Sequence, residues 1–461
     1  MKIVICASEV FPFAKTGGLA DVTGALPLAL ENLGEEINVF MPKYQMVSEG
    51  KWHLRKVKNG LFYTVIGKNI KVYLIEHNDY FNRPGLYGEK SGDYPDNLDR
   101  FVFFTKKTLE FLKDIDFKPD VIHVHDWQTS LIPIYLKTIY KGVSFYKNIK
   151  VLLTIHNIGY QGLFPREEFH KLGLDWSLFN IEGLEFYNQI NLLKGGIIFS
   201  DAINTVSPTY SKEIQTKEFG FGLEGVLANK KDKLYGILNG IDYSVWNPAT
   251  DKLIFSNYSP EDISGKHKNK EELQRLCKLP IRDAILFGMV SRLAEQKGWD
   301  ILAEAMDEIC KLDLQIVILG TGDLKYHLIL EEISRKYPDI CSVHLKFDEV
   351  LAHRIYAGSD VFLMPSKYEP CGLGQMISLK YATPPLVFKT GGLADTVCED
   401  NGFVFDTYNK EELIKTIKKA LSLYKDKTYW NSLLRRTFNY NFSWEESAKK
   451  YIELYRKLMN L

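Results

Sequence analysis

The stretch "KIVICASEVFPFAKTGGLADVTGALPLALENLG", residues 2–34, decides the fold class. It begins with a short run rich in Val and Ile, continues through a loop with paired glycines, and ends in a segment with helical periodicity. The apolar face of that segment consists of Leu19, Val22, Leu26, Ala29, Leu30 and Leu33. A buried strand that leads through a glycine loop into an amphipathic helix is the repeating unit of a doubly wound α/β domain.

The same strand-and-helix pattern recurs in two series along the chain. The first series contains "INVFMP", "VYLIEH", "VIHVHD", "VLLTIHN" and "AINTVS", and the second contains "AILFGMVS", "LQIVILG", "SVHLKF", "VFLMPS" and "PPLVFKT". A chain of 461 residues also exceeds the size of about 250–300 residues at which a single core stops growing. We therefore expect an α/β protein with two doubly wound, Rossmann-like domains.

The weakest patterning lies around residues 245–275, where prolines and charges interrupt any periodicity. We place the interdomain link there, with a first domain at 1–245 and a second at 246–442. A final amphipathic helix, 443–461, begins at "FSWEES". The sequence leaves open whether this helix packs on the second domain or crosses back to the first.

The composition indicates where the protein works and what it binds. Lys and Arg number 58, as do Asp and Glu, so no overall field attracts nucleic acid or an anionic membrane, and a polymer partner should be uncharged. The six cysteines lack metal-binding spacing, which fits reduced thiols. The chain starts directly as a strand and has no apolar run of about 18 residues, so we expect a cytoplasmic protein, bacterial rather than plastid-targeted.

The heptapeptide "KTGGLAD" occurs at Lys15–Asp21 and again at Lys389–Asp395. In the first copy, Gly17 and Gly18 lie at a helix N-terminus just after a strand, where backbone N–H groups and the helix dipole bind anions. Lys15 adds a positive charge. A tight turn with an incidental lysine is the alternative interpretation. The second copy follows a late strand, so we expect it mainly to shape a pocket wall.

Three segments of the second series carry candidate donor-binding residues. "SRLAEQKGWD" places Arg292 and Lys297 after a strand, where both can bind a diphosphate, although a solvated charge pair is the alternative. "ILGTGD" places Gly320 and Gly322 for backbone contact with a nucleotide. "MPSKYEPCGLGQM" combines an acid suited to sugar hydroxyls with a helix start suited to phosphate, and its candidates are Glu369, Cys371, Gly372 and Leu373.

Taken together, the motifs resemble those of the bacterial glycogen synthases and plant starch synthases, which are retaining glucosyltransferases of the GT-B fold (glycosyltransferase family 5). The resemblance covers essentially the whole chain. It rests on "SEVFPFAKTGGLADV", "HVHDWQTSL", "TIHNIGYQG", "NTVSPTY", "GILNGID", "SRLAEQKGWD", "MPSKYEPCGLGQM" and "KTGGLADTV". The chain departs from the family pattern at Ala20, Lys367 and Gly374, which stand where the family has Gly, Arg and Thr.

The resemblance implies a deep cleft between the domains, where glucose passes from ADP-glucose to the non-reducing 4-hydroxyl of an α-1,4-glucan with release of ADP. It also implies roles for individual residues. Lys15, Gly17, Gly18 and Asp21 approach the donor, Arg292 and Lys297 neutralise its diphosphate, Glu369 holds the sugar, and His156, Asp126 and Asn239 line the glucose site.

These assignments make a metal-free transfer plausible, because fixed positive charge stabilises a departing diphosphate. The "HVHD" segment has two histidines on one strand face without further ligands nearby, so we expect no metal and no cofactor. No carboxylate stands out as a nucleophile. We therefore take departure and attack on the same face as the hypothesis. Tyr94, Trp127 and Tyr160 are candidate stacking platforms for acceptor sugars.

Two other interpretations remain at this point. One is a different GT-B enzyme, with a UDP-glucose donor or a sucrose, trehalose or lipid acceptor. The other is a protein that binds glucan or nucleotide without catalysis, which would be expected to lack Lys15, Lys297 or Glu369. All three residues are present, and no basic, amphipathic stretch suited to a membrane is found in the first domain.

Overall fold

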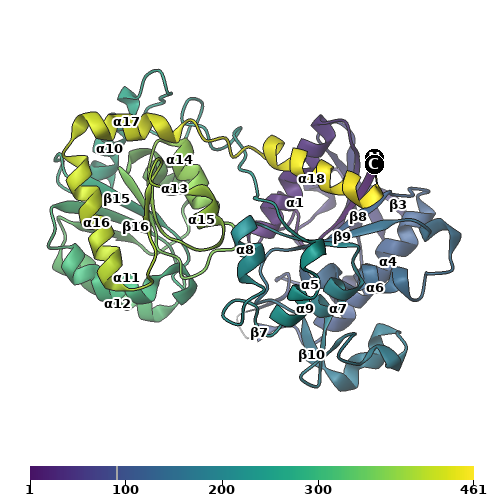
Figure 1. Cartoon of the computed structure of the whole chain (residues 1–461). Helices are drawn as coiled ribbons and strands as arrows, with labels where there is room; N and C mark the ends of the chain where they lie inside the picture. Colours follow the sequence, from purple (N-terminus) through teal and green to yellow (C-terminus); the bar gives the residue numbers. More distant parts are fainter. Residues whose placement is uncertain (90–91, 461) are drawn as a thin grey trace. The chain divides into compact units, whose positions relative to one another are not determined.

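The structure, a computed structural model, describes residues 1–89 and 92–460. The chain forms two compact units (Figure 1). The first comprises Met1–Asn239 together with the chain from Trp444 on, and the second comprises Gly240–Ser443. The boundary therefore lies before the expected position at 245/246. The stretch around 245–275 is not a link, because it belongs to the second unit.

The first domain is built on a mainly parallel sheet with the strand order β14-β13-β9-β8-β1-β2-β5-β4-β3. Its strands are β1 (Lys2–Cys6), β2 (Glu36–Pro42), β3 (Arg55–Lys58), β4 (Leu61–Ile66), β5 (Ile70–Ile75), β8 (Val121–His125), β9 (Lys150–Ile155), β13 (Ala202–Thr205) and β14 (Leu234–Gly236). The edge strand β3 pairs antiparallel with β4, and β4 pairs antiparallel with β5. A small antiparallel sheet contains β10 (Leu163–Pro165), β11 (Glu185–Phe186) and β12 (Gln189–Asn191), and β6 (Gly88–Glu89) pairs with β7 (Gly92–Asp93).

The second domain has a parallel sheet with the order β17-β16-β15-β18-β19-β20. Its strands are β15 (Ile285–Val290), β16 (Leu314–Leu319), β17 (Cys341–His344), β18 (Val361–Met364), β19 (Pro385–Phe388) and β20 (Phe403–Phe405). Numbered from β15, this is the order 3-2-1-4-5-6 of the Rossmann fold. The order in which successive strands are added therefore reverses between the parallel strands β15 and β18, and in the first domain it reverses in the same way between β1 and β8. Ligands of such sheets bind beyond the carboxyl ends of the strands at these points.

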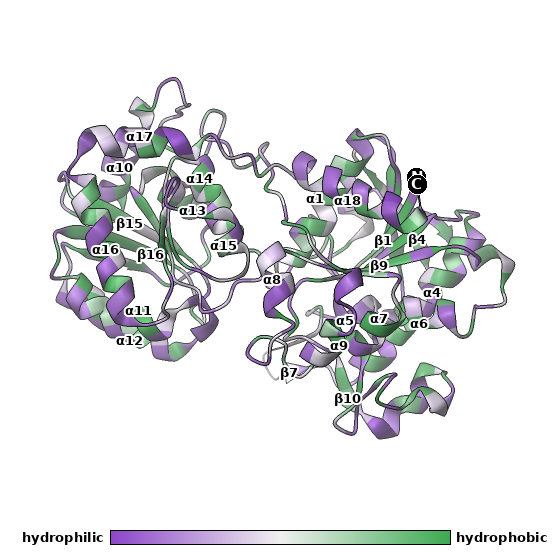
Figure 2. Cartoon of the chain, viewed as in Figure 1, coloured by the Kyte–Doolittle hydropathy of each residue, from purple (hydrophilic) through white to green (hydrophobic). Residues whose placement is uncertain are grey.

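Helices complete both domains. In the first they are α1 (Gly18–Asn32), α2 (Glu49–Trp52), α3 (Asn78–Phe81), α4 (Asn97–Asp114), α5 (Asp126–Thr129), α6 (Leu131–Lys137), α7 (Leu192–Phe199), α8 (Pro208–Glu213) and α9 (Glu224–Ala228). In the second they are α10 (Ser264–Leu276), α11 (Trp299–Ile309), α12 (Leu324–Lys336), α13 (Glu349–Gly358), α14 (Gly374–Lys380), α15 (Gly391–Thr396), α16 (Lys410–Tyr424) and α17 (Lys427–Thr437). Figure 2 shows that the strands are mainly hydrophobic and that the helices carry both hydrophobic and hydrophilic residues. Every residue of β8 and β16 is buried, as expected for sheets covered on both faces.

The last helix, α18 (Trp444–Met459), returns to the first domain and lies beside α1 (Figure 1). Tyr455 on this helix contacts His123 of β8, with 2.8 Å between its hydroxyl and Nδ1. Tyr451 accepts a hydrogen bond from the amide of Asn204 at 3.1 Å. Of the two placements that the sequence left open, the structure therefore has the helix on the first domain.

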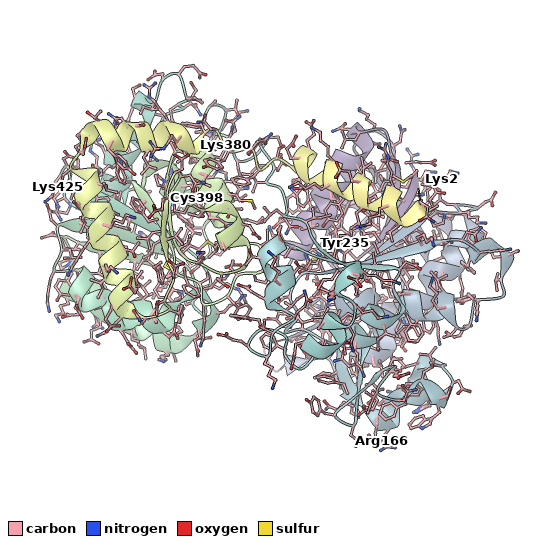
Figure 3. The ribbon with its side chains drawn as sticks, in the orientation of Figure 1. Lys2, Arg166, Tyr235, Lys380, Cys398 and Lys425 are labelled. Carbon is pink, nitrogen blue, oxygen red and sulfur yellow. The ribbon has the colours of Figure 1, made fainter. Side chains whose placement is uncertain are left out.

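The cysteines are free thiols, all buried except Cys398, which is labelled in Figure 3. Among the residues described, no helix has both the length and the apolar character needed to span a membrane.

Candidate active site

The first-domain cluster lies where the strand order reverses. The loop after β1 carries Glu9 and Lys15, and the short helix α5, which directly follows the neighbouring strand β8, begins at Asp126. Both segments follow the carboxyl ends of parallel strands, so they share one edge of the sheet. The sequence placed candidate residues on both segments, and the topology puts them at the position where a doubly wound sheet binds ligands.

In the loop before α1, the outer side is unobstructed, but two backbone N–H groups already have a hydrogen-bond partner inside the domain. A Cβ atom added at Gly17 or Gly18 would meet no atom within 4 Å. The N–H groups of Thr16 and Gly17, however, donate to the Glu9 carboxylate at 2.5 and 3.3 Å. The expectation that Gly17 offers a free N–H to an anion is therefore wrong. The free donors at this helix start are those of its first residues, from Gly18 on.

Lys15 and Asp21 form an ion pair, with 2.6 Å between Nζ and Oδ1. Their side chains are 47% and 30% exposed, and the Lys15 ammonium also lies 5.5 Å from the centre of the Phe11 ring. An exposed pair of this kind contributes little to stability. An anionic ligand can therefore take the place of Asp21 on Lys15 at small cost.

Asp126, His156 and His125 form a connected group. The backbone N–H of His156 donates to Asp126 Oδ1 at 2.7 Å, and His156 Nε2 lies 3.0 Å from His125 Nδ1. Burial lowers the pKa of His156 to about 3 and that of His125 well below its usual range. Both rings are therefore neutral near pH 7, so one nitrogen of the contact donates and the other accepts.

The carboxyl group of Asp126 is unusual in both conformation and charge. Its backbone φ is +53°, in the left-handed region that non-glycine residues rarely adopt. Burial raises its pKa to about 7, against the opposing effect of the hydrogen bond from His156. A carboxyl group with a pKa raised to about 7 in a cluster of polar groups is typical of a functional site.

Replacing Asp126 by Asn should stabilise the protein more at pH 8 than at pH 5. A carboxyl with a raised folded-state pKa loses stability as pH rises from about 4 to about 7, because the unfolded chain ionises first. Asn keeps an oxygen for the His156 N–H but carries no charge. Thermal unfolding of both proteins at the two pH values checks this. An advantage of Asp126→Asn that shrinks toward pH 8 would contradict burial as the cause.

Asn239, at the end of the first unit, is 6% exposed. Its Oδ1 atom is buried and has no hydrogen-bond partner among the described residues. A buried acceptor left without a donor is rare in folded proteins. It fits the role in a glucose site that the sequence resemblance implies, where a ligand hydroxyl would supply the donor.

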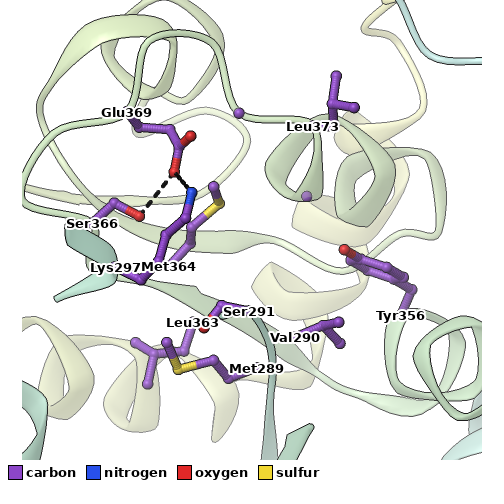
Figure 4. Close-up of a pocket in the computed structure, with 12 residues that line it drawn as sticks. Met289, Val290, Ser291, Lys297, Tyr356, Leu363, Met364, Ser366, Glu369 and Leu373 are labelled. Carbon is purple, nitrogen blue, oxygen red and sulfur yellow. Dashed lines mark hydrogen bonds and ion pairs between the residues drawn. The ribbon is translucent and has the colours of Figure 1, made fainter. Parts of the chain in front are cut away.

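The second-domain cluster surrounds a cavity of about 150 Å³ (Figure 4). Its walls come from the ends of β15 and β18, from Lys297, and from the loop that leads into α14. The lining residues are Met289, Val290, Ser291, Lys297, Tyr356, Leu363, Met364, Ser366, Glu369, Gly372, Leu373 and Gly374. Because β15 and β18 are the strands between which the order reverses, this cavity occupies the ligand position of the Rossmann fold.

Lys297 and Glu369 form the charged centre of this cavity. The ammonium lies 2.5 Å from Glu369 Oε2, and the Ser366 hydroxyl donates to the same oxygen at 3.0 Å. Figure 4 shows both side chains pointing at the carboxylate. The two ions are only 17% and 8% exposed, so removing either would leave a buried charge without its partner. From the sequence we expected separate roles for Lys297 and Glu369, but in the structure their side chains form an ion pair.

Arg292 lies on the loop after β15 and is exposed. Its carbonyl oxygen accepts a hydrogen bond from the Trp299 indole at 3.0 Å, which fixes the backbone. No described residue forms an ion pair or hydrogen bond with its guanidinium. Arg292 is therefore available to an anionic ligand, as a diphosphate-binding arginine must be.

The backbone N–H groups of Gly320 and Gly322, which we expected to contact a nucleotide, have partners in this structure. Their N–H groups already donate to the His344 carbonyl at 3.1 Å and to His327 Nε2 at 3.2 Å. A Cβ atom at Gly320 would stand 2.0 Å from the Ser291 carbonyl oxygen. Both glycines therefore let the 320–322 turn pack against the loop that carries Arg292, and nucleotide contact at this turn stays a prediction.

The second heptapeptide also serves packing. A Cβ at Gly391 would lie 2.0 Å from the Glu369 carbonyl oxygen, and one at Gly392 would lie 2.0 Å from that of Cys371. The Gly392 N–H donates to the Glu369 carbonyl at 3.0 Å, and Lys389 pairs with exposed Asp406. Cys371 itself is buried and does not line the cavity. This copy of the heptapeptide is therefore a support for the Glu369 loop.

The three aromatic candidates differ in exposure. Tyr160 is 62% exposed and could stack on a sugar. Trp127 is 9% exposed and packs edge-on against Phe101 and Phe164, so its proposal as a surface platform is wrong. Tyr94 is half-buried, with the guanidinium groups of two arginines 4.9 and 5.0 Å from its ring centre. Its ring is therefore already in contact with charged groups.

Sequence reasoning missed two residues of these clusters, Glu9 and Ser366. Both lie inside the motifs that carry the resemblance, and a search for acids and hydroxyls next to the glycine loops would have found them. Within the described ranges, no group of three His, Cys, Asp or Glu side chains is placed to hold a metal ion.

Comparison with known proteins agrees with this geometry. Residues 2–229 match the family model of the starch synthase catalytic domain, and residues 274–435 match that of the glycosyl transferases group 1. Glycogen synthases from Geotalea daltonii and Fervidobacterium nodosum are 50% and 46% identical to the chain. The alignments cover 100% and 99% of the chain, and 99% of each relative.

Solved structures give the same result. The catalytic domain of starch synthase IV from Arabidopsis thaliana, bound to ADP and acarbose, superposes with a TM-score of 0.90 at 33% identity, covering 100% of this chain and 99% of the other. Sucrose-phosphate synthase from Thermosynechococcus elongatus reaches a TM-score of 0.64 at 18% identity, over 100% and 99% of the two chains. The second likeness shows the shared fold alone.

The two Rossmann-like domains and their clusters define a glycosyltransferase of the GT-B fold, which confirms the fold expected from the sequence. The chain belongs to the glycogen synthase and starch synthase family, whose members transfer glucose from a nucleotide sugar.

Proposed function

We propose that the protein transfers glucose from ADP-glucose to the non-reducing 4-hydroxyl of an α-1,4-glucan, with retention of configuration and release of ADP. The observation that carries the proposal is the Lys297–Glu369 pair in the cavity at the reversal point of the second sheet. The ADP and acarbose of the starch synthase IV relative support an adenine nucleotide and a sugar chain as ligands.

Each cluster contributes chemistry to this reaction. Lys297 and the exposed Arg292 place fixed positive charge where a diphosphate leaves, which stabilises the charge that develops as the bond to glucose breaks. Glu369 accepts hydrogen bonds from sugar hydroxyls and orients Lys297. Neutral His156 and the carboxyl of Asp126 supply further hydrogen bonds to glucose, as does Asn239.

Transfer on one face of the sugar accounts for retention without a protein nucleophile. In this proposal the departing phosphate takes the proton of the acceptor hydroxyl while the new bond forms on the same side. Charge compensation comes from Arg292 and Lys297, so the proposal includes no metal and no cofactor. A cytoplasmic location also remains part of the proposal, supported by the free thiols of all six cysteines.

The proposal is tested by glucose incorporation into glycogen, with ADP-glucose and UDP-glucose in parallel and with EDTA present. We expect strong incorporation from ADP-glucose that EDTA does not reduce. Preference for UDP-glucose would overturn the donor but keep the reaction. If neither donor is used while ADP still binds, the acceptor is wrong, and a GT-B enzyme with a sucrose, trehalose or lipid acceptor becomes the better explanation.

A further inference from the structure

Glu9 is a buried carboxylate in the first-domain cluster for which the proposed function gives no role. It is 3% exposed and follows β1 by a few residues. One oxygen, Oε2, accepts the N–H groups of Thr16 and Gly17 at 2.5 and 3.3 Å. The other, Oε1, accepts the Thr16 hydroxyl at 2.6 Å and the Tyr87 hydroxyl at 2.7 Å.

Two of the hydrogen-bond partners of Glu9 are backbone N–H groups of the kind that bind an external anion. Two consecutive backbone N–H groups beside a helix N-terminus are a common arrangement for binding an anion such as phosphate. Here a side chain of the same domain holds that position. The Ser8 hydroxyl lies 2.7 Å from the Tyr87 hydroxyl. Because the Tyr87 hydroxyl donates to Glu9, it accepts a hydrogen bond from Ser8.

We propose that Glu9 is a positioning residue that fixes the first "KTGG" loop from beneath, as an internal anion, and thereby directs the donor's anionic groups to Lys15 and the N–H groups of Gly18 and the residues after it. The proposal rests on the proposed function for the identity of the donor. It assigns no contact between Glu9 and the substrate. Glu9 acts through Thr16 and Gly17. Because their N–H groups bind its carboxylate, they do not compete with Gly18 for the anionic groups of the donor.

This arrangement has a specific consequence for binding. An unsupported glycine pair samples many backbone conformations, and ordering it reduces affinity. With Thr16 and Gly17 held by three hydrogen bonds to Glu9, the loop is ordered before the donor arrives. Loss of the Glu9 carboxylate should therefore raise the donor KM more than it lowers kcat.

The test compares Glu9→Gln and Glu9→Ala with the unmodified protein. Glu9→Gln keeps one oxygen acceptor but loses the other, so we expect the donor KM to rise about tenfold, on the scale of a lost hydrogen bond to a charged group. Glu9→Ala removes a CH₂–COO⁻ group, which acetate matches in size and charge. Acetate should restore the donor KM of Glu9→Ala in a saturable manner, and chloride at equal ionic strength should not.

A second readout does not depend on the reaction. Hydrogen exchange at the amides of Thr16 and Gly17 should be faster in both variants and should slow again in Glu9→Ala when acetate is added. If the unmodified protein transferred no glucose, the proposed function would fail, but this exchange experiment would still decide the role of Glu9.

Glu31 supplies the matched control. Its carboxylate likewise accepts two backbone N–H groups, from Lys68 at 2.8 Å and Asn69 at 2.6 Å, in a turn that carries no candidate site residue. Glu31→Ala should leave the donor KM unchanged, with or without acetate. A folded Glu9→Ala with normal donor KM and normal exchange would overturn the proposal, as would a defect that acetate does not reduce. Should Glu9→Ala not fold, a normal donor KM in Glu9→Gln would overturn it equally.

Discussion

Lys297→Ala is expected to lower kcat by at least about 10²-fold, the scale for losing one group that stabilises developing charge. Two effects combine in this variant. The diphosphate loses a fixed cation, and Glu369, at 8% exposure, loses the ammonium 2.5 Å from its carboxylate. Steady-state kinetics with ADP-glucose and glycogen measure the change.

A double-mutant cycle separates these effects. If Lys297 and Glu369 act as a unit, the variant carrying both Lys297→Ala and Glu369→Gln should lose about as much activity as either single variant. The buried pair of Lys270 and Asp360 in the same domain, with 2.6 Å between its charged atoms and similarly low exposure, is the control. Lys270→Ala should reduce stability and leave the kcat of folded protein nearly unchanged. Near-normal turnover in Lys297→Ala would contradict the role assigned to it.

Gly392→Ala should damage both stability and turnover, whereas Gly18→Ala, at the equivalent position of the other heptapeptide, should damage only donor binding. A methyl group at Gly392 meets the Cys371 carbonyl oxygen at 2.0 Å, but one at Gly18 meets nothing within 4 Å. Overpacking of this kind costs about 1–3 kcal/mol, or roughly 2–4 °C in Tm per kcal/mol for a domain of this size. Displacing the Glu369 loop by about 1 Å can lower kcat about 10²-fold.

Gly402→Ala distinguishes misplacement of Glu369 from general destabilisation. Its added methyl would stand 2.5 Å from the Pro385 carbonyl oxygen, away from the Glu369 loop. We expect a lower Tm for this variant but a normal kcat for the folded fraction. Equal losses of kcat in Gly392→Ala and Gly402→Ala would argue against support of Glu369 by the second heptapeptide, and an unchanged Tm in Gly392→Ala would argue against the crowding itself.

The sequence predicted the features that depend on local pattern. Buried strands of Val and Ile, each followed by a glycine loop and an amphipathic helix, specify doubly wound domains because the periodicity and the turns are local properties. The same logic placed Lys15, Arg292 and Glu369 on loops at carboxyl ends of strands. The domain boundary was misplaced because charges and prolines around 245–275 suggested a linker, although this stretch packs into the second domain.

By itself, then, the sequence determined the fold class, the family and the loops that carry the chemistry. Only the tertiary structure decided what surrounds each side chain, because those contacts join residues far apart in the chain. Lys297 meets Glu369 across 72 positions, and α18 returns to His123 across 332. Two identical heptapeptides acquire opposite surroundings, open space over Gly18 and a carbonyl oxygen against the equivalent Gly392, because each follows a different strand of a different sheet.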